Sequence, residues 1–173
     1  MSFYTTDDRS LAILRVVVWF LLGMLALAAM LLLVVGLASI FGGGGVADGL
    51  KLGNDPRAIW LFRGLLVIGL VAIATAVRFF RELLAIIDTV GQGDPFVPDN
   101  ADRLERMGWI SLILVAIGLV MTALAVTLKG MAPEVEVSVE ISPGILVLTL
   151  VLFVLARVFR HGTEMRRDLE GTV

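Results

Sequence analysis

The sequence of 173 residues contains no cysteine and only one histidine, His161. Without thiols the chain cannot form disulfides, iron–sulfur clusters or thiolate zinc sites. A lone imidazole is a poor start for a metal site, so neither a metal nor a cofactor is expected. The sequence also lacks a nucleophile–base pair and a phosphate-binding loop. These absences predict a protein that is not an enzyme.

Acidic residues are absent from four long apolar stretches, and no proline interrupts them. The stretches are residues 16–41, 58–77, 108–128 and 143–156. A helix needs about 20 apolar residues to cross a hydrocarbon core about 30 Å thick, and the first three stretches reach that length. The fourth reaches it if it begins at residue 141 and an arginine at its end extends to the headgroups. Together with a mean hydropathy of +0.97, the stretches predict an integral membrane protein.

The predicted fold is an all-α membrane protein, a four-transmembrane-helix bundle that forms a single membrane domain over residues 1–173. Its spans, with their cytoplasmic extensions, are expected at residues 11–41, 58–90, 100–128 and 141–168, and its outer loops at 42–57 and 129–142. Arg63 is the one ionisable residue within the apolar stretches, which disfavours a transporter. It is expected to reach the outer surface or to pair with an outer acid such as Asp55 or Glu140.

Lysine and arginine are distributed unequally between the segments outside the spans. Ten belong to the two termini and the segment between the second and third spans, and four to the opposite side. Because basic segments stay in the cytoplasm, both termini are predicted to be cytoplasmic. The net charge of −2 and the absence of a basic stripe argue against direct nucleic-acid binding. The lipid bilayer is therefore the first expected partner.

Residues 134–142, EVEVSVEIS, alternate strictly between polar and apolar side chains, which predicts a β-strand. A lone strand is not stable, so residues 46–52 are expected to pair with it and form a small extracytoplasmic β-strand pair. Two interpretations stay open. The pair is a lid over the bundle, or its edge accepts an extracytoplasmic peptide as an added strand.

Helical periodicity continues past the second span through residues 78–90, with an amphipathic pattern. This extension either lies against headgroups and neighbouring helices or docks a partner helix. Arg78 and Glu82 are spaced to pair along it. In the following segment Asp99 or Asn100 is expected to cap the next helix. The acids Asp94, Asp99, Asp102 and Glu105 are interpreted as caps and solvated charges.

Phe96 is an apolar side chain in a polar loop, held between Pro95 and Pro98. The prolines restrict the backbone, so the ring is expected to point in a fixed direction. Burial of the ring stabilises the loop, and the expected contact is the apolar side of residues 79–87 or 158–169. The loop would then be an ordered surface that a partner could recognise.

The loop and the tail together resemble a known family. The loop carries the pattern G-x-P-F-x-x-x-N-A-x-R-L, here Gly93, Pro95, Phe96, Asn100, Ala101, Arg103 and Leu104, and the tail reads VFRHGTEMRRDLEGTV. Both are similar to domain of unknown function 2975, a family of small bacterial membrane proteins with four spans. The resemblance implies the bacterial cytoplasmic membrane and supplies no activity. It also implies a regulatory setting, since relatives are often encoded beside small helix-turn-helix regulators.

Two functions follow as hypotheses. In the first, the chain acts by protein–protein contact, as a membrane partner or sensor for a cytoplasmic helix-turn-helix regulator. The candidate contact residues are Pro95, Phe96, Asn100, Arg103, Arg166, Arg167 and Asp168. In the alternative, the chain is an immunity or protective protein whose outer cap binds a toxin or peptide at strand 134–142. A regulator gene next door would favour the first hypothesis, and a secreted toxin the second.

Overall fold

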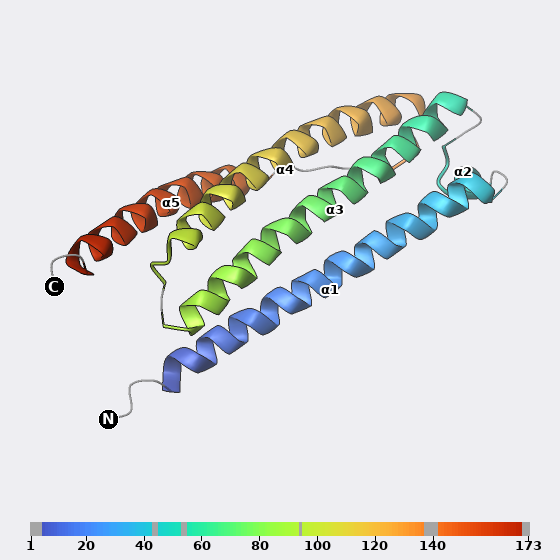
Figure 1. Ribbon diagram of the computed structural model, residues 1–173. Coiled ribbons are helices and arrows are strands. Elements are labelled where there is room, and N and C mark those ends of the chain that lie inside the picture. The colour runs from blue at the N-terminus through green and yellow to red at the C-terminus, as the bar shows by residue number, and fades with distance from the viewer. Residues whose placement is uncertain (1–4, 43–44, 53–54, 94, 137–141, 171–173) are drawn as a thin grey trace. The chain divides into compact units, whose positions relative to one another are not determined.

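The computed structural model describes residues 5–42, 45–52, 55–93, 95–136 and 142–170. Its helices are α1 (Thr5–Phe41), the short α2 (Gly45–Gly49), α3 (Pro56–Gly91), α4 (Pro98–Met131) and α5 (Pro143–Glu170) (Figure 1). The four longer helices are each long and apolar enough to cross a membrane. The prediction of an all-α fold with four membrane-spanning helices is thereby confirmed, and the chain is a multi-pass membrane protein.

Proline occupies the first residue of three of these helices, α3, α4 and α5. The fixed φ angle of proline suits the first helical turn, where its missing N–H is not needed. Before α3, the carboxylate of Asp55 accepts a hydrogen bond from the backbone N–H of Arg57 at 2.9 Å and caps the helix. α3 ends at Gly91, and Gly93, with a φ of 86°, turns the chain toward α4.

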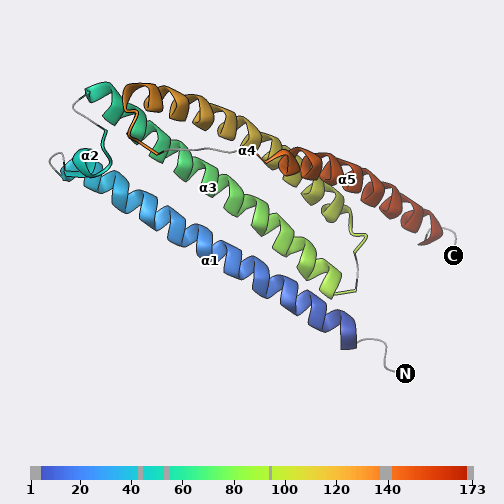
Figure 2. The same ribbon diagram turned by 180° about the vertical axis from the view of Figure 1, so that it is seen from behind.

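The residues cluster into two compact units, which we describe separately. Unit 1 comprises Met1–Gly23, Ala76–Leu112 and Pro143–Val173, and unit 2 comprises Met24–Thr75 and Ile113–Ser142. Unit 1 therefore contains α5, both ends of the chain and the loop between α3 and α4, which Figures 1 and 2 show from opposite sides. Unit 2 contains α2 and the segment that follows α4.

The core of unit 1 forms where α3, α4 and α5 pack together. Its buried residues are Leu104, Met107, Leu152 and Ala156, and the partly buried side chains packed against them are Phe79, Leu83, Ile86 and Phe159. Within each helix these positions recur every three or four residues, so they share one face. The amphipathic pattern predicted for residues 78–90 therefore buries its apolar side against neighbouring helices.

The core of unit 2 joins α3 and α4 to the segments that flank them. Its buried residues are Leu52, Ala58, Leu65, Leu128, Ala132 and Val135, with Leu61, Phe62, Met121 and Leu124 packed against them. Leu128 and Ala58 are fully buried. This core is entirely apolar.

The predicted β-strand pair is not present among the residues that the structure describes. Residues 45–49 form the helix α2, so the expected pairing strand at 46–52 is wrong. That segment has no alternating pattern, and Lys51 has a φ of 55°, which is incompatible with an extended strand. Residues 137–141 of the other expected strand lie outside the described residues. The two segments meet through side chains instead, since Lys51 pairs with Glu134 at 3.2 Å.

Arg63 does not pair with Asp55, contrary to one of the predicted arrangements, and the carboxylate of Asp55 caps α3. Within unit 2 its guanidinium donates a hydrogen bond to the backbone carbonyl of Ser39 and lies 5.4 Å from the centre of the Trp60 ring. Ser39 belongs to the last turn of α1, whose carbonyls lack partners within the helix. The cation therefore interacts with the negative end of the α1 dipole. The other acid considered, Glu140, lies outside the described residues.

Candidate functional site

The ring of Phe96 packs against α5 in unit 1. Its centre lies 5.4 Å from the centre of the Phe159 ring, and the Oγ1 of Thr163 donates to the Phe96 carbonyl at 3.1 Å. Gly162 makes room for the ring, since a Cβ at that position would lie 2.9 Å from two ring atoms. Phe96 was predicted to pack against residues 79–87 or 158–169, and packing against the second segment is confirmed. The loop and the tail are therefore joined.

Asn100 holds the same loop from the inside and is fully buried. Its side-chain amide donates to the Oγ1 of Thr89 at 2.8 Å and to the carbonyl of Pro95 at 3.0 Å. Its Oδ1 accepts from the guanidinium of Arg103 at 2.9 Å, and Arg103 also reaches the carbonyl of Ala85 at 3.5 Å. The amide thus connects the end of α3, the loop and the start of α4.

These contacts change the interpretation of two candidate contact residues. Asn100 has no exposed surface, and the side chain of Arg103 is 20% exposed. Asn100 also lies inside the first turn of α4, which begins at Pro98, so its side chain is not the cap that the sequence predicted. Both residues stabilise the loop from the interior of unit 1 through their hydrogen bonds. The more exposed candidates are Phe96 in the loop and the tail residues Arg166, Arg167 and Asp168.

Arginine–carboxylate pairs connect the helices of unit 1 in succession. Arg15 of α1 pairs with Asp88 of α3, Arg106 of α4 with Glu82 of α3 at 3.2 Å, and Arg160 of α5 with Asp102 and Glu105 of α4 at 3.1 and 2.6 Å. All but Glu82 have side chains about half exposed, so each pair contributes little by itself. Together, the pairs determine which face of each helix is turned toward its neighbour.

This series of ion pairs is not predicted from the sequence. Asp102 and Glu105 were interpreted as caps and solvated charges, but both bind Arg160. Glu82 binds Arg106 across the hairpin, and no ion pair joins it to Arg78 among the residues described. One signal was present, because Glu82 and Arg106 lie at equal distances in sequence from position 94, the middle of the loop. Residues equidistant from a tight turn lie at the same level of an antiparallel helix pair.

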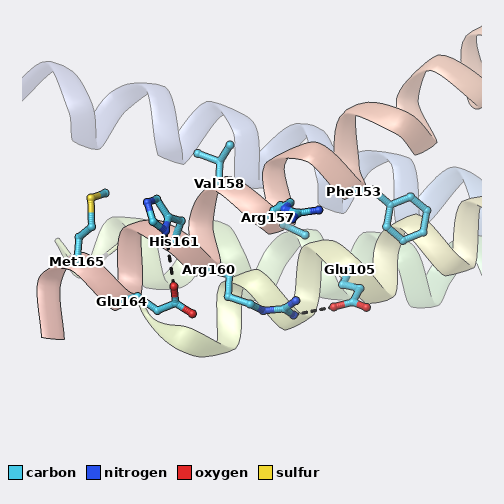
Figure 3. Close-up of a pocket in the computed structure, with 9 residues that line it drawn as sticks. Glu105, Phe153, Arg157, Val158, Arg160, His161, Glu164 and Met165 are labelled. Atoms are coloured by element: carbon cyan, nitrogen blue, oxygen red, sulfur yellow. Dashed lines mark hydrogen bonds and ion pairs between the residues drawn. The ribbon is translucent and has the colours of Figure 1, made fainter. Parts of the chain in front are cut away.

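A groove of about 870 Å³ opens along α5 and the start of α4 in unit 1 (Figure 3). Its lining combines apolar and charged side chains, namely Phe153, Ala156, Val158, Met165, Glu105, Arg157, Arg160, His161 and Glu164. Two carboxylates of the lining are engaged: Glu105 accepts from Arg160, and Glu164 lies 3.6 Å from the Nδ1 of His161. Arg157 has no ion partner in the described part of the chain. The groove was not foreseen from the sequence.

Within the described ranges no group of three histidine and acidic side chains comes together in a way that could hold a metal ion. What the arrangement offers is a surface. The loop presents the exposed part of Phe96, and the last turns of α5 present charged side chains of both signs.

Comparison with known proteins gives one match. The family model described as "Protein of unknown function (DUF2975)" covers residues 53–173, which include the loop, the groove and the tail. No curated protein and no solved structure matches the chain.

Proposed function

The chain belongs to the DUF2975 family of proteins of unknown function, and from this premise we propose that it is a non-enzymatic protein of the bacterial cytoplasmic membrane that acts by protein–protein contact. The observation that carries the proposal is the docking of Phe96 on Phe159 and Gly162. Docking gives loop and tail one fixed geometry. A partner that binds a preorganised surface loses less conformational entropy than one that must order a free loop.

The partner that we propose is a cytoplasmic helix-turn-helix regulator. It would bind the loop–tail surface, which consists of Pro95, Phe96, Arg166, Arg167 and Asp168. Aromatic rings and arginines are the kinds of side chain that dominate binding energy at protein interfaces. Asn100 and Arg103 would act indirectly, by holding the loop in place.

The distribution of charge supports a cytoplasmic position for the loop and the tail of unit 1. All ten of the lysines and arginines assigned to the basic side belong to unit 1, and the other four, Lys51, Arg57, Arg63 and Lys129, belong to unit 2. Reporter fusions after Val90 and Val173 should therefore act as cytoplasmic, and a fusion after Ala132 as external. The reverse pattern would remove the loop–tail surface from any cytoplasmic regulator.

Site-specific photo-crosslinking in living cells tests the partner. A photoreactive residue in place of Arg167 should give a protein adduct, and the same residue in place of Val126, an exposed apolar side chain of α4, should give lipid adducts only. The captured protein, identified and purified, should bind the full chain in nanodiscs. Phe96→Ala should weaken that binding at least tenfold. Lipid adducts alone at both position 167 and position 126 would contradict the proposal. So would a binding affinity that is the same for the wild type and for Phe96→Ala.

The alternative function, an immunity or protective protein with an outer binding edge, has less support. It relied on a strand pair, and residues 45–49 form a helix. Residues 137–141, where the exposed edge was expected, lie outside the described residues. No contact described in unit 2 favours a toxin or peptide as ligand.

A further inference from the structure

In the groove along α5 and the start of α4, which we call the α4–α5 groove, some charged side chains have an ion partner and others do not. Arg160 forms ion pairs with two carboxylates, those of Asp102 and Glu105. These three side chains together therefore carry a net charge of −1. Only the Oε2 of Glu105 is engaged by Arg160. Arg157, in the same lining, carries a positive charge with no ion partner among the residues that are described. Among the described residues the groove therefore offers a cation without an ion partner, Arg157, and a free carboxylate oxygen on Glu105.

The position of Arg157 along α5 places these charges at a membrane boundary. Arg157 follows directly after the apolar run of residues 144–156, whose exposed side chains include Val147, Val151 and Val154. An arginine at the end of a span lies at the level of the lipid phosphates. Trp109, half exposed and with its ring centre 5.6 Å from that of Phe153, is also typical of that level.

From this geometry we infer that the α4–α5 groove binds the headgroup of a phospholipid that carries both a phosphate and a primary ammonium, as phosphatidylethanolamine does. The guanidinium of Arg157 would bind the phosphate, and the free oxygen of Glu105 would accept from the ammonium. Phe153, one turn before Arg157 on the membrane side, would contact the upper part of the acyl chains. Figure 3 shows Arg157, Glu105 and Phe153 around one opening.

The balance of charge selects this headgroup over others. The ionised groups of the lining are two arginines, Arg157 and Arg160, and two glutamates, Glu105 and Glu164. An anionic headgroup such as phosphatidylglycerol could bind Arg157 through its phosphate but has no cationic group for the free oxygen of Glu105. The quaternary ammonium of phosphatidylcholine has no N–H to donate to a carboxylate. The inference does not depend on the proposed regulator, and it concerns a different part of unit 1.

Native mass spectrometry of the full chain, released from detergent with equimolar phosphatidylethanolamine, phosphatidylcholine and phosphatidylglycerol, tests the site. The wild type should retain phosphatidylethanolamine about tenfold over the other two, the factor expected from one charge-assisted hydrogen bond. Arg157→Gln and Glu105→Gln should each abolish the preference. Arg81→Gln removes an exposed arginine outside the groove and should leave it unchanged.

Glu105→Gln also weakens an inter-helix ion pair, so Glu82→Gln serves as its matched control. Glu82→Gln likewise breaks an α3–α4 pair with an arginine but does not line the groove, and it should keep the lipid preference. Arg157→Gln breaks no ion pair between described residues, so its result stands whatever Glu105→Gln does to folding. Equal retention of all three lipids, a preference for phosphatidylglycerol, or a preference that survives Arg157→Gln would overturn the inference.

Discussion

Unit 1 and unit 2 are stabilised by different kinds of contact. In unit 1 the helices are linked by a series of arginine–carboxylate pairs and by the buried amide of Asn100, beside a small apolar core. In unit 2 the buried core is wholly apolar, and the one arginine within the apolar stretches, Arg63, binds a backbone carbonyl. Lipid chains are as apolar as leucine, so helices within a bilayer are held by close packing and by few polar contacts.

The difference predicts how the stability of each unit should respond to salt. Ion pairs need water or headgroups around their exposed halves, and they are weakened by salt. An apolar cluster such as that around Leu128 is insensitive to salt. If the comparison is right, changes in unit 1 should respond to ionic strength and changes in unit 2 should not.

The largest expected effect lies in unit 2. Leu128 is fully buried, so Leu128→Ala leaves a cavity and should lower the free energy of unfolding by about 2 to 3 kcal/mol, near the low end for such changes because lipid reduces the transfer contribution. Denaturant titration of the purified protein in detergent measures this loss. The loss should be the same at low and high salt. A strong salt dependence would break the comparison.

Asn100→Ala should have the next largest effect, in unit 1. It removes the bonds to Thr89, Pro95 and Arg103 and leaves buried polar groups unsatisfied, which should cost about 2 kcal/mol. Limited proteolysis should show faster cleavage in the α3–α4 loop. Thr127→Ala, whose hydroxyl bonds only within its own helix, is the control and should leave cleavage unchanged. Unaltered cleavage in Asn100→Ala would mean that the amide does not order the loop.

Phe96→Ala should cost about 1 to 2 kcal/mol, less than a fully buried ring, because the residue is 41% exposed. The tail after residue 158 should become more sensitive to protease, since it loses its contact with the loop. Phe41→Ala removes a ring that is 82% exposed and provides the control. Equal protease sensitivity in the wild type and in Phe96→Ala would show that the loop is not docked, and the proposed surface would lose its basis.

Arg106→Gln should have the smallest effect, about 0.5 kcal/mol, because the arginine side chain is half exposed. A double-mutant cycle with Glu82→Gln isolates the coupling between the two residues. The coupling should shrink as salt is raised to 1 M, where the screening length falls to about 3 Å. If the coupling energy does not change with salt, this pair does not behave as a salt-sensitive member of the series of arginine–carboxylate pairs in unit 1.

The sequence predicted the features that depend on residues close together in the chain. Four spans follow from the length of the apolar stretches. The docking of Phe96 also followed, because a lone aromatic ring between prolines has few ways to be buried other than against a nearby helix end.

Features that depend on which helices are neighbours were not predicted. The pairing of Arg160 with Glu105 requires α5 to lie beside α4 with a particular face turned toward it, and periodicity within one helix does not contain that information. The groove was missed for the same reason. The strand prediction for residues 46–52 was wrong. It was made only because the strand expected at residues 134–142 needed a partner, and residues 46–52 do not themselves show the alternating pattern of a strand.

Hydrogen exchange in a Gly162→Leu variant tests the central claim, that the loop is docked on α5, most directly. The new side chain would occupy the space of the Phe96 ring, whereas Gly130→Leu, at a glycine with nothing within 4 Å, is the matched control. We expect the amides of Gly93 and Asn100, which donate to Val90 and Val97, to exchange at least tenfold faster in Gly162→Leu and at the wild-type rate in Gly130→Leu. Unchanged exchange at both amides in Gly162→Leu would contradict the account.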